Sequence, residues 1–128
     1  MEKIKARILL VDDEALVLLG WEHSLRSAGY DVRTAMDAKE AIKAVCEQGP
    51  DIVITDLIMP DMNGIELCRK IRALSPGTDV VLLTGFPGKQ GDHQRDFIEA
   101  GGRDIFLIKP LSTQEIIRAV EAIMKERS

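Results

Sequence analysis

The sequence predicts a doubly wound α/β protein, in which helices cover both faces of one parallel β-sheet. Strand-like and helix-like segments alternate along the chain, and the strand-like runs are almost entirely apolar, as in a sheet that is buried on both faces. Parallel strands joined by helices need right-handed crossovers, which leaves few other arrangements. Several of the runs also end in chemically active residues, which indicates a site at one edge of the sheet.

Length and composition are typical of one soluble domain over residues 1–128. A chain of this length buries roughly two-thirds of its unfolded surface, which is enough for a core. Hydrophobic residues make up 45% and charged residues 30%, a mixture that argues against disorder and against a membrane span. The net charge of −4 leaves no basic surface for direct nucleic-acid binding. No targeting segment is recognisable, so a cytoplasmic location is expected.

Each expected element can be justified in turn. Short apolar runs, several of them rich in β-branched residues, predict strands at residues 8–11, 32–35, 52–55, 80–83 and 105–108. Helices are expected at residues 15–28, 38–47 and 64–74, somewhere within 94–100, and after Pro110. The last helix is the best marked, because Ser112 and Glu115 form a capping box. Five glycines between Thr84 and Lys109 predict a fourth helix that is short, displaced or mobile, with His93 in an exposed loop.

Acidic residues follow two of the expected strands. Asp12 and Asp13 come directly after the first strand, and Asp56 comes after the third. Because the carboxyl ends of parallel strands face one crevice, these residues should meet there with Thr84 and Lys109 from the next two strand ends. Two bare carboxylates about 4 Å apart repel by about 4 kcal/mol at an effective dielectric constant of 20. A Mg²⁺ ion, which prefers carboxylate oxygens, would relieve this repulsion.

A simpler explanation exists for part of this pattern. In this explanation Asp12 and Asp13 only cap the first helix, where negative charge is favoured by the helix dipole. Capping needs one carboxylate, however, and it does not explain why Asp56 and Lys109 stand at matching strand ends. The whole set therefore favours a site.

The ordered set of Asp12-Asp13, Asp56, Thr84 and Lys109-Pro110 resembles the receiver domain of the two-component response-regulator family over essentially the whole chain. The resemblance implies a flavodoxin-like fold, with a five-stranded parallel sheet of order 2-1-3-4-5 and about five helices. It also implies a cis peptide bond before Pro110.

The resemblance assigns roles to individual residues. Asp56 would be the phosphoacceptor, a carboxylate nucleophile that forms an aspartyl phosphate. Asp13, Asp56 and the backbone carbonyl of Ile58 would hold Mg²⁺, and Asp12 would act largely through a bound water. The remaining candidates would respond to the phosphoryl group: Lys109 by pairing with its oxygens, Thr84 by a hydrogen bond, and Phe106 as the switch aromatic.

The expected function is signalling by phosphorylation, with a phosphohistidine on a sensor histidine kinase or a phosphotransfer protein as donor. The domain would catalyse only its own phosphorylation and dephosphorylation. It would switch the surface formed by the fourth helix, the fifth strand and the last helix. The output activity, and whether the domain stands alone or belongs to a larger protein, stay open at this point.

Two alternatives from other classes also stay open. A metal-dependent phosphohydrolase could use the same acids, although the haloacid-dehalogenase signature separates two aspartates by one residue and Asp12-Asp13 are adjacent. A pseudo-receiver that only binds other proteins would keep the fold without the chemistry, although no pocket residue is missing here.

Three apolar features lead to further expectations about donor docking and about the lifetime of the phosphorylated form. The run at residues 16–19 cannot fit one helical stripe, so Leu16 and Leu19 are expected to form part of a docking surface for the phosphodonor. Ile58 and Phe86 stand two residues beyond Asp56 and Thr84. Neither side chain offers a hydrogen bond to the water that would hydrolyse the aspartyl phosphate, so this phosphate is expected to be comparatively long-lived.

Overall fold

The computed structural model describes residues 4–84 and 90–127, apart from the side chains of residues 90–92. The strands are β1 (Arg7–Val11), β2 (Asp31–Ala35), β3 (Ile52–Asp56), β4 (Asp79–Thr84) and β5 (Phe106–Ile108). The helices are α1 (Ala15–Ser27), α2 (Ala38–Glu47), α3 (Gly64–Leu74), α4 (Gln90–Glu99) and α5 (Thr113–Arg127). All pairings are parallel and the strand order is β2-β1-β3-β4-β5, which confirms the predicted flavodoxin-like fold.

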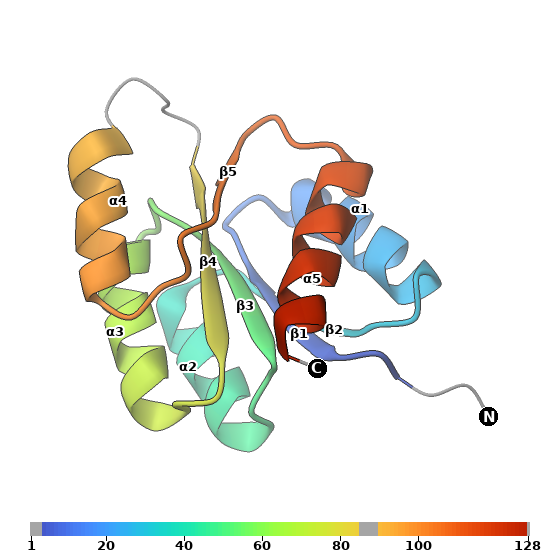
Figure 1. The fold of residues 1–128 in the computed structure, drawn as a ribbon, viewed down its shortest axis with the longest axis horizontal. Helices are drawn as coiled ribbons and strands as arrows, with labels where there is room; N and C mark the ends of the chain where they lie inside the picture. The colour runs from blue at the N-terminus through green and yellow to red at the C-terminus, as the bar shows by residue number, and fades with distance from the viewer. Residues whose placement is uncertain (1–3, 85–89, 128) are drawn as a thin grey trace.

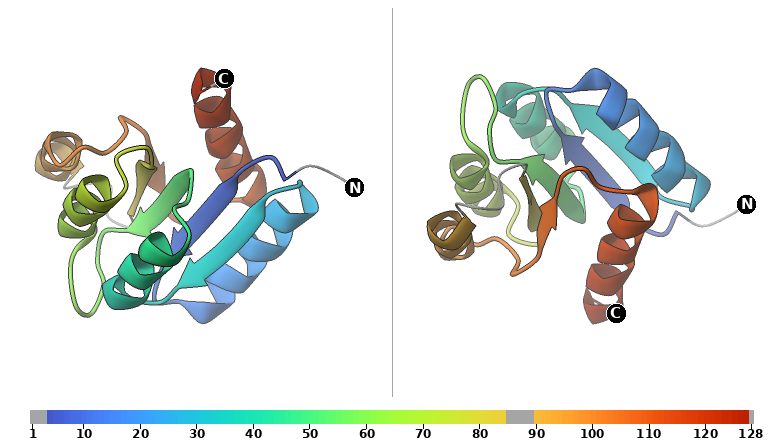
Figure 2. Two further views of the ribbon diagram at one scale, coloured as in Figure 1. Left: turned by 90° about the horizontal axis from the view of Figure 1, so that it is seen from below. Right: turned by 90° about the horizontal axis from the view of Figure 1, so that it is seen from above.

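The sheet separates two hydrophobic cores. Helices α1 and α5 cover one face, and α2, α3 and α4 cover the other (Figure 1), as the further views in Figure 2 also show. Successive residues of β1 point to opposite faces: Ile8 and Leu10 belong to the core under α1 and α5, whereas Leu9 and Val11 belong to the other core. Every residue of β3 is buried, because this strand is central and covered on both faces.

Two helices end at a glycine with positive φ. At the end of α1, Gly29 has φ 102°, and the Gly29 and Tyr30 N–H groups donate to carbonyl oxygens of the last helical turn. Gly101 has φ 100° after α4, and Gly101 and Gly102 repeat the pattern. Both are Schellman motifs, which a residue with a Cβ would strain. They turn the chain sharply into β2 and towards β5.

The fourth helix differs from the expectation. It begins at Gln90 and has ten residues, as many as α2, so it is not short. His93 is exposed as expected, but it lies in this helix rather than in a loop. The strand that follows begins at Phe106, one residue later than predicted, and the bond between Lys109 and Pro110 is cis, as the resemblance implied.

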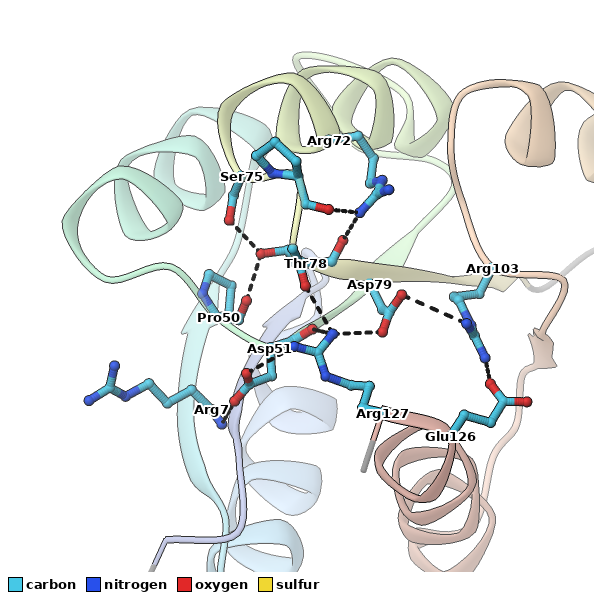
Figure 3. A network of polar contacts seen from close by, with 12 residues as sticks. Arg7, Pro50, Asp51, Arg72, Ser75, Thr78, Asp79, Arg103, Glu126 and Arg127 are labelled. Carbon is cyan, nitrogen blue, oxygen red and sulfur yellow. Dashed lines mark hydrogen bonds and ion pairs between the residues drawn. The ribbon is translucent and has the colours of Figure 1, made fainter.

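The last turn of α5 is fastened to the edge of the sheet where β3 and β4 begin (Figure 3). The Arg127 guanidinium donates to the Gly77 carbonyl oxygen over 2.9 Å and to Asp79 Oδ2 over 2.8 Å, and it lies 3.3 Å from Asp51 Oδ1. Arg103 pairs with Glu126 of the same turn. No helix in the described part of the chain is long and apolar enough to cross a membrane.

Candidate functional site

The predicted functional residues lie mainly at one edge of the sheet, where the parallel strands end. Asp56 and Thr84 are the last residues of β3 and β4, Asp12 directly follows β1, and Lys109 directly follows β5. Thr84 pairs in register with Ile108, and the Lys109 N–H donates to the Thr84 carbonyl oxygen over 2.8 Å. The register of the sheet therefore brings the ends of β4 and β5 together.

Three carboxylates and one ammonium meet at this edge. Asp12, Asp13 and Asp56 each have a carboxylate oxygen within 4.8 Å of the other two. Asp12 and Asp56 are buried, with 1% and 9% of their surface exposed, whereas Asp13 is exposed. Lys109 Nζ lies 2.6 Å from Asp12 Oδ2 and 3.2 Å from Asp56 Oδ2. One ammonium offsets only one of the three negative charges.

Backbone contacts fix the two buried carboxylates. The Asp12 N–H donates to the Ala35 carbonyl oxygen over 3.1 Å, and Asp12 Oδ1 accepts the Glu14 N–H over 3.0 Å. Behind Asp56, α3 begins at Gly64 so close to β3 that a Cβ on Gly64 would overlap the Asp56 carbonyl oxygen. Only glycine lets the helix start in this position without moving Asp56.

Asp56 and Lys109 affect each other's ionisation. Burial raises the pKa of Asp56; the Lys109 charge opposes this rise and the Asp12 charge adds to it. Burial alone would lower the pKa of Lys109, but its close contact with the Asp12 carboxylate and the charges of Asp56 and Asp12 outweigh this effect, so this pKa is raised. A further cation beside Asp12 and Asp56 would favour the carboxylate form that a nucleophile needs.

This set of donors fits a hard divalent cation. Mg²⁺ takes one or two protein carboxylates together with other oxygen ligands and waters. Within the described residues, Asp12 Oδ2 is buried and accepts no hydrogen bond of good geometry, although the Lys109 ammonium lies close to it. A cation would supply the positive charge that the site lacks, and Asp12, Asp13 and Asp56 are the side chains placed to hold it or its waters.

A pocket opens over the carboxylates. Its lining consists of Asp13, Glu14, Asp56, Leu57, Ile58, Thr84 and Lys109. Thr84 is almost fully buried, with 3% of its surface exposed, whereas Ile58 is 57% exposed. The predicted phosphoacceptor, lysine, threonine and Ile58 thus border one space. Phe86, which was expected to border it as well, lies outside the described residues.

Phe106 is not among the lining residues of this pocket. It pairs in register with Leu82 and is half-buried. Its ring packs edge-on against Phe97 of α4, with 5.9 Å between the ring centroids and 67° between the planes. Phe106 therefore contacts α4 and the core below it, and it is linked to the pocket through β4 and β5.

A second, more apolar groove adjoins the pocket. It lies between the first turns of α1 and the segment that joins β5 to α5, and its lining consists of Glu14, Leu16, Val17, Gly20, Trp21, Lys109, Pro110, Leu111 and Thr113. Leu16 is 84% exposed and Leu19, one turn further on, is 61% exposed. Leu16 and Leu19 therefore face outward, as expected.

Two residues at the site were not singled out from the sequence. Glu14 Oε1 lies 3.2 Å from Lys109 Nζ and forms the third ion pair of that lysine. Gly64 sets the approach of α3 to Asp56. The acidic run from Asp12 to Glu14 and the Asn63-Gly64 dipeptide were the available signals.

Fold and site together define an acidic pocket with one lysine at the carboxyl edge of a flavodoxin-like sheet, and comparison with known proteins identifies the class. The family described as response regulator receiver domain matches residues 8–121. The chain belongs to this family and is a receiver domain of two-component response regulators.

Curated relatives and solved structures agree with this assignment. The chain is 34% identical to the probable transcriptional regulatory protein TcrX of Mycobacterium tuberculosis, covering 92% of this chain and 49% of the relative. It is 32% identical to the alkaline phosphatase synthesis transcriptional regulatory protein PhoP of Bacillus subtilis, covering 93% and 48%. The chain thus spans about half the length of these relatives. A CheY-like receiver domain from Methanospirillum hungatei is 28% identical and superposes with a TM-score of 0.87, over 94% of each chain.

Proposed function

We propose that this receiver domain accepts a phosphoryl group on Asp56 from a phosphohistidine of a sensor histidine kinase or a phosphotransfer protein. The observation that carries the proposal is the position of Asp56, buried at the end of β3 with Lys109 Nζ 3.2 Å from its carboxylate and the open pocket in front of it. The domain would catalyse only its own phosphorylation and dephosphorylation, and we expect it to work in the cytoplasm, as is typical of the family.

The proposed chemistry needs positive charge and hydrogen-bond donors around the transferred group. Lys109 would move from its carboxylate partners to the phosphoryl oxygens, and Thr84 would donate its hydroxyl hydrogen to them. Asp13, Asp56 and the backbone carbonyl of Ile58 would hold Mg²⁺, with Asp12 acting through a bound water. The ion would balance charge on the transferred oxygens.

The proposed response is a shift of the surface formed by α4, β5 and α5. The added group carries about −1.5 to −2 charges, and drawing Thr84 towards it would disturb the β4 and β5 ends. Phe106 sits on β5 against Phe97 of α4, so a change in its packing would reach that helix. The curated relatives named above are called transcriptional regulatory proteins, which supports a regulatory output.

The test is incubation of the purified chain with acetyl phosphate and Mg²⁺, followed by intact mass measurement. We expect a gain of one phosphoryl group that requires the metal. Asp56→Asn and Asp56→Ala should abolish the gain, and Asp12→Asn should weaken its dependence on Mg²⁺. Asp104→Asn, at an exposed position between α4 and β5, is the matched control and should label like the parent.

Three other results would each contradict the proposal, and each would point to a different explanation. Undiminished labelling of both Asp56 variants would show that another residue is the acceptor. Continuous hydrolysis of the donor, without labelled protein, would indicate the phosphohydrolase. No reaction at all, together with no transfer from any donor protein, would leave the pseudo-receiver.

A further inference from the structure

Glu14 occupies a helix-capping position but does not act as a cap. It is the N-cap residue of α1, and its side chain accepts no capping hydrogen bond. Instead, its carboxylate reaches across to Lys109, with Oε1 3.2 Å from Nζ. The Glu14 side chain is 59% exposed, whereas that of Lys109 is 19% exposed. The charge of Glu14 therefore stands at the entrance to the acidic pocket, on the solvent side of the half-buried Lys109 ammonium.

The ion pair of Glu14 and Lys109 lies between the acidic pocket and the apolar groove. Both residues line the acidic pocket over Asp56, and both line the apolar groove between α1 and the segment from β5 to α5. They are the two residues that these linings share within the described part of the chain. A small phosphodonor that enters the pocket, or a protein donor seated over the groove, passes the Glu14 carboxylate.

This placement gives Glu14 two effects on an incoming donor. It competes with phosphoryl oxygens for Lys109, and its negative charge repels an anionic donor at the entrance. A partly exposed pair of this kind is worth little to stability, so the carboxylate can be displaced when enough contact energy is available. A docked protein supplies that energy over a large surface, whereas a free small molecule does not.

We infer that Glu14 determines donor specificity, disfavouring phosphorylation of Asp56 by free anionic acyl phosphates. The inference rests on the proposed role of Asp56. In the reaction concerned, a carboxylate oxygen of Asp56 bonds to phosphorus as the bond from phosphorus to the acetate oxygen breaks. Acetate leaves with the electron pair of that bond. Glu14 takes no part in these bonds; it acts on the approach of the donor and on the position of Lys109.

The test compares labelling rates for two donors of different charge. Glu14→Gln keeps the shape and removes the charge, so at low salt it should speed labelling by acetyl phosphate, mainly a dianion at neutral pH, about three- to tenfold. The gain should be smaller with phosphoramidate, which carries one negative charge less. It should also shrink in about 1 M salt, where the Debye length falls to about 3 Å. Glu14→Ala should behave like Glu14→Gln.

The matched control is Glu47→Gln, the same charge change at an exposed residue at the end of α2, where Glu47 pairs with Arg33. It should label at the parent rate. If the parent is labelled but the Glu14 variants are labelled at the same rate or more slowly, the inference about Glu14 is overturned and the proposed role of Asp56 is not. A gain that is equal for both donors and insensitive to salt would have the same consequence, since that would mean a steric effect. If neither the parent nor the Glu14 variants are labelled by the small donors or by a phosphorylated donor protein, both proposals are overturned.

Discussion

Ile58 is the described side chain best placed to affect the water that would remove a phosphoryl group from Asp56. It stands two residues beyond Asp56, borders the pocket and is 57% exposed. A branched alkyl group offers a water molecule no hydrogen bond. An aspartyl phosphate at Asp56 is therefore expected to be comparatively long-lived, because hydrolysis needs a water held in line with the phosphorus.

Replacement of Ile58 by asparagine should shorten that lifetime. One orienting group typically changes a rate by 10²-fold or more, so even a partial effect should give roughly a tenfold faster loss. The measurement is the decay of intact phosphorylated protein with Mg²⁺ present. Ile58→Leu, which stays apolar, is the control and should decay like the parent. If the asparagine variant decays no faster than these two proteins, Ile58 does not govern the lifetime.

At the residue scale, the sequence was informative where backbone topology decides the position of a side chain. Asp12, Asp56, Thr84 and Lys109 were predicted to converge because each stands at the end of a strand. Glu14 was not, because its contact with Lys109 joins residues 95 positions apart and depends on how both side chains are turned. No periodicity or spacing in the sequence carries that information.

At the scale of elements, Arg127 holds the last turn of α5 against the sheet. Its guanidinium contacts the Asp79 carboxylate, the Gly77 carbonyl oxygen and the Asp51 carboxylate, which anchor the beginnings of β3 and β4 (Figure 3). A lone surface ion pair adds little, but several charge-assisted hydrogen bonds on one side chain that is 30% exposed add more.

Arg127→Ala should therefore lower the free energy of unfolding by about 1–2 kcal/mol. The measurement is the midpoint of urea denaturation, with the slope of the transition unchanged. Arg118→Ala removes an exposed arginine from the middle of the same helix and should change the free energy by less than about 0.5 kcal/mol. Equal effects of the two variants would mean that the contacts of Arg127 add nothing specific.

The elements themselves were predicted with uneven success. The first three helices and all five strands were placed within one or two residues, because each has a clear apolar pattern between turn residues. The start of α4 was missed by four residues, since Gln90, Gly91 and Asp92 have no helical pattern of apolar residues. Among the described side chains of α4 only Phe97 is buried, so the sequence carried a weak signal for this helix.

At the scale of the whole molecule, the first and the last helix contribute to one surface. Helix α1 and helix α5 lie on the same face of the sheet (Figure 1), and the groove between α1 and the segment from β5 to α5 joins them beside the acidic pocket. Leu16 is 84% exposed on this surface and borders the apolar groove, so it offers apolar area that a docked partner would cover. A protein donor seated there would bring its phosphohistidine towards Asp56.

Leu16→Gln should therefore slow phosphoryl transfer from the donor protein about tenfold or more, because burying a leucine side chain is worth about 1.5–3 kcal/mol. Labelling by acetyl phosphate should stay at the parent rate, since a small donor does not need the groove. A neutral replacement is essential here, because a new negative charge beside Glu14 would itself repel the small donor. Leu74→Gln, at an exposed leucine that ends α3, is the matched control for both reactions. If Leu16→Gln slows both reactions equally, Leu16 supports the fold of the site and the docking surface must lie elsewhere.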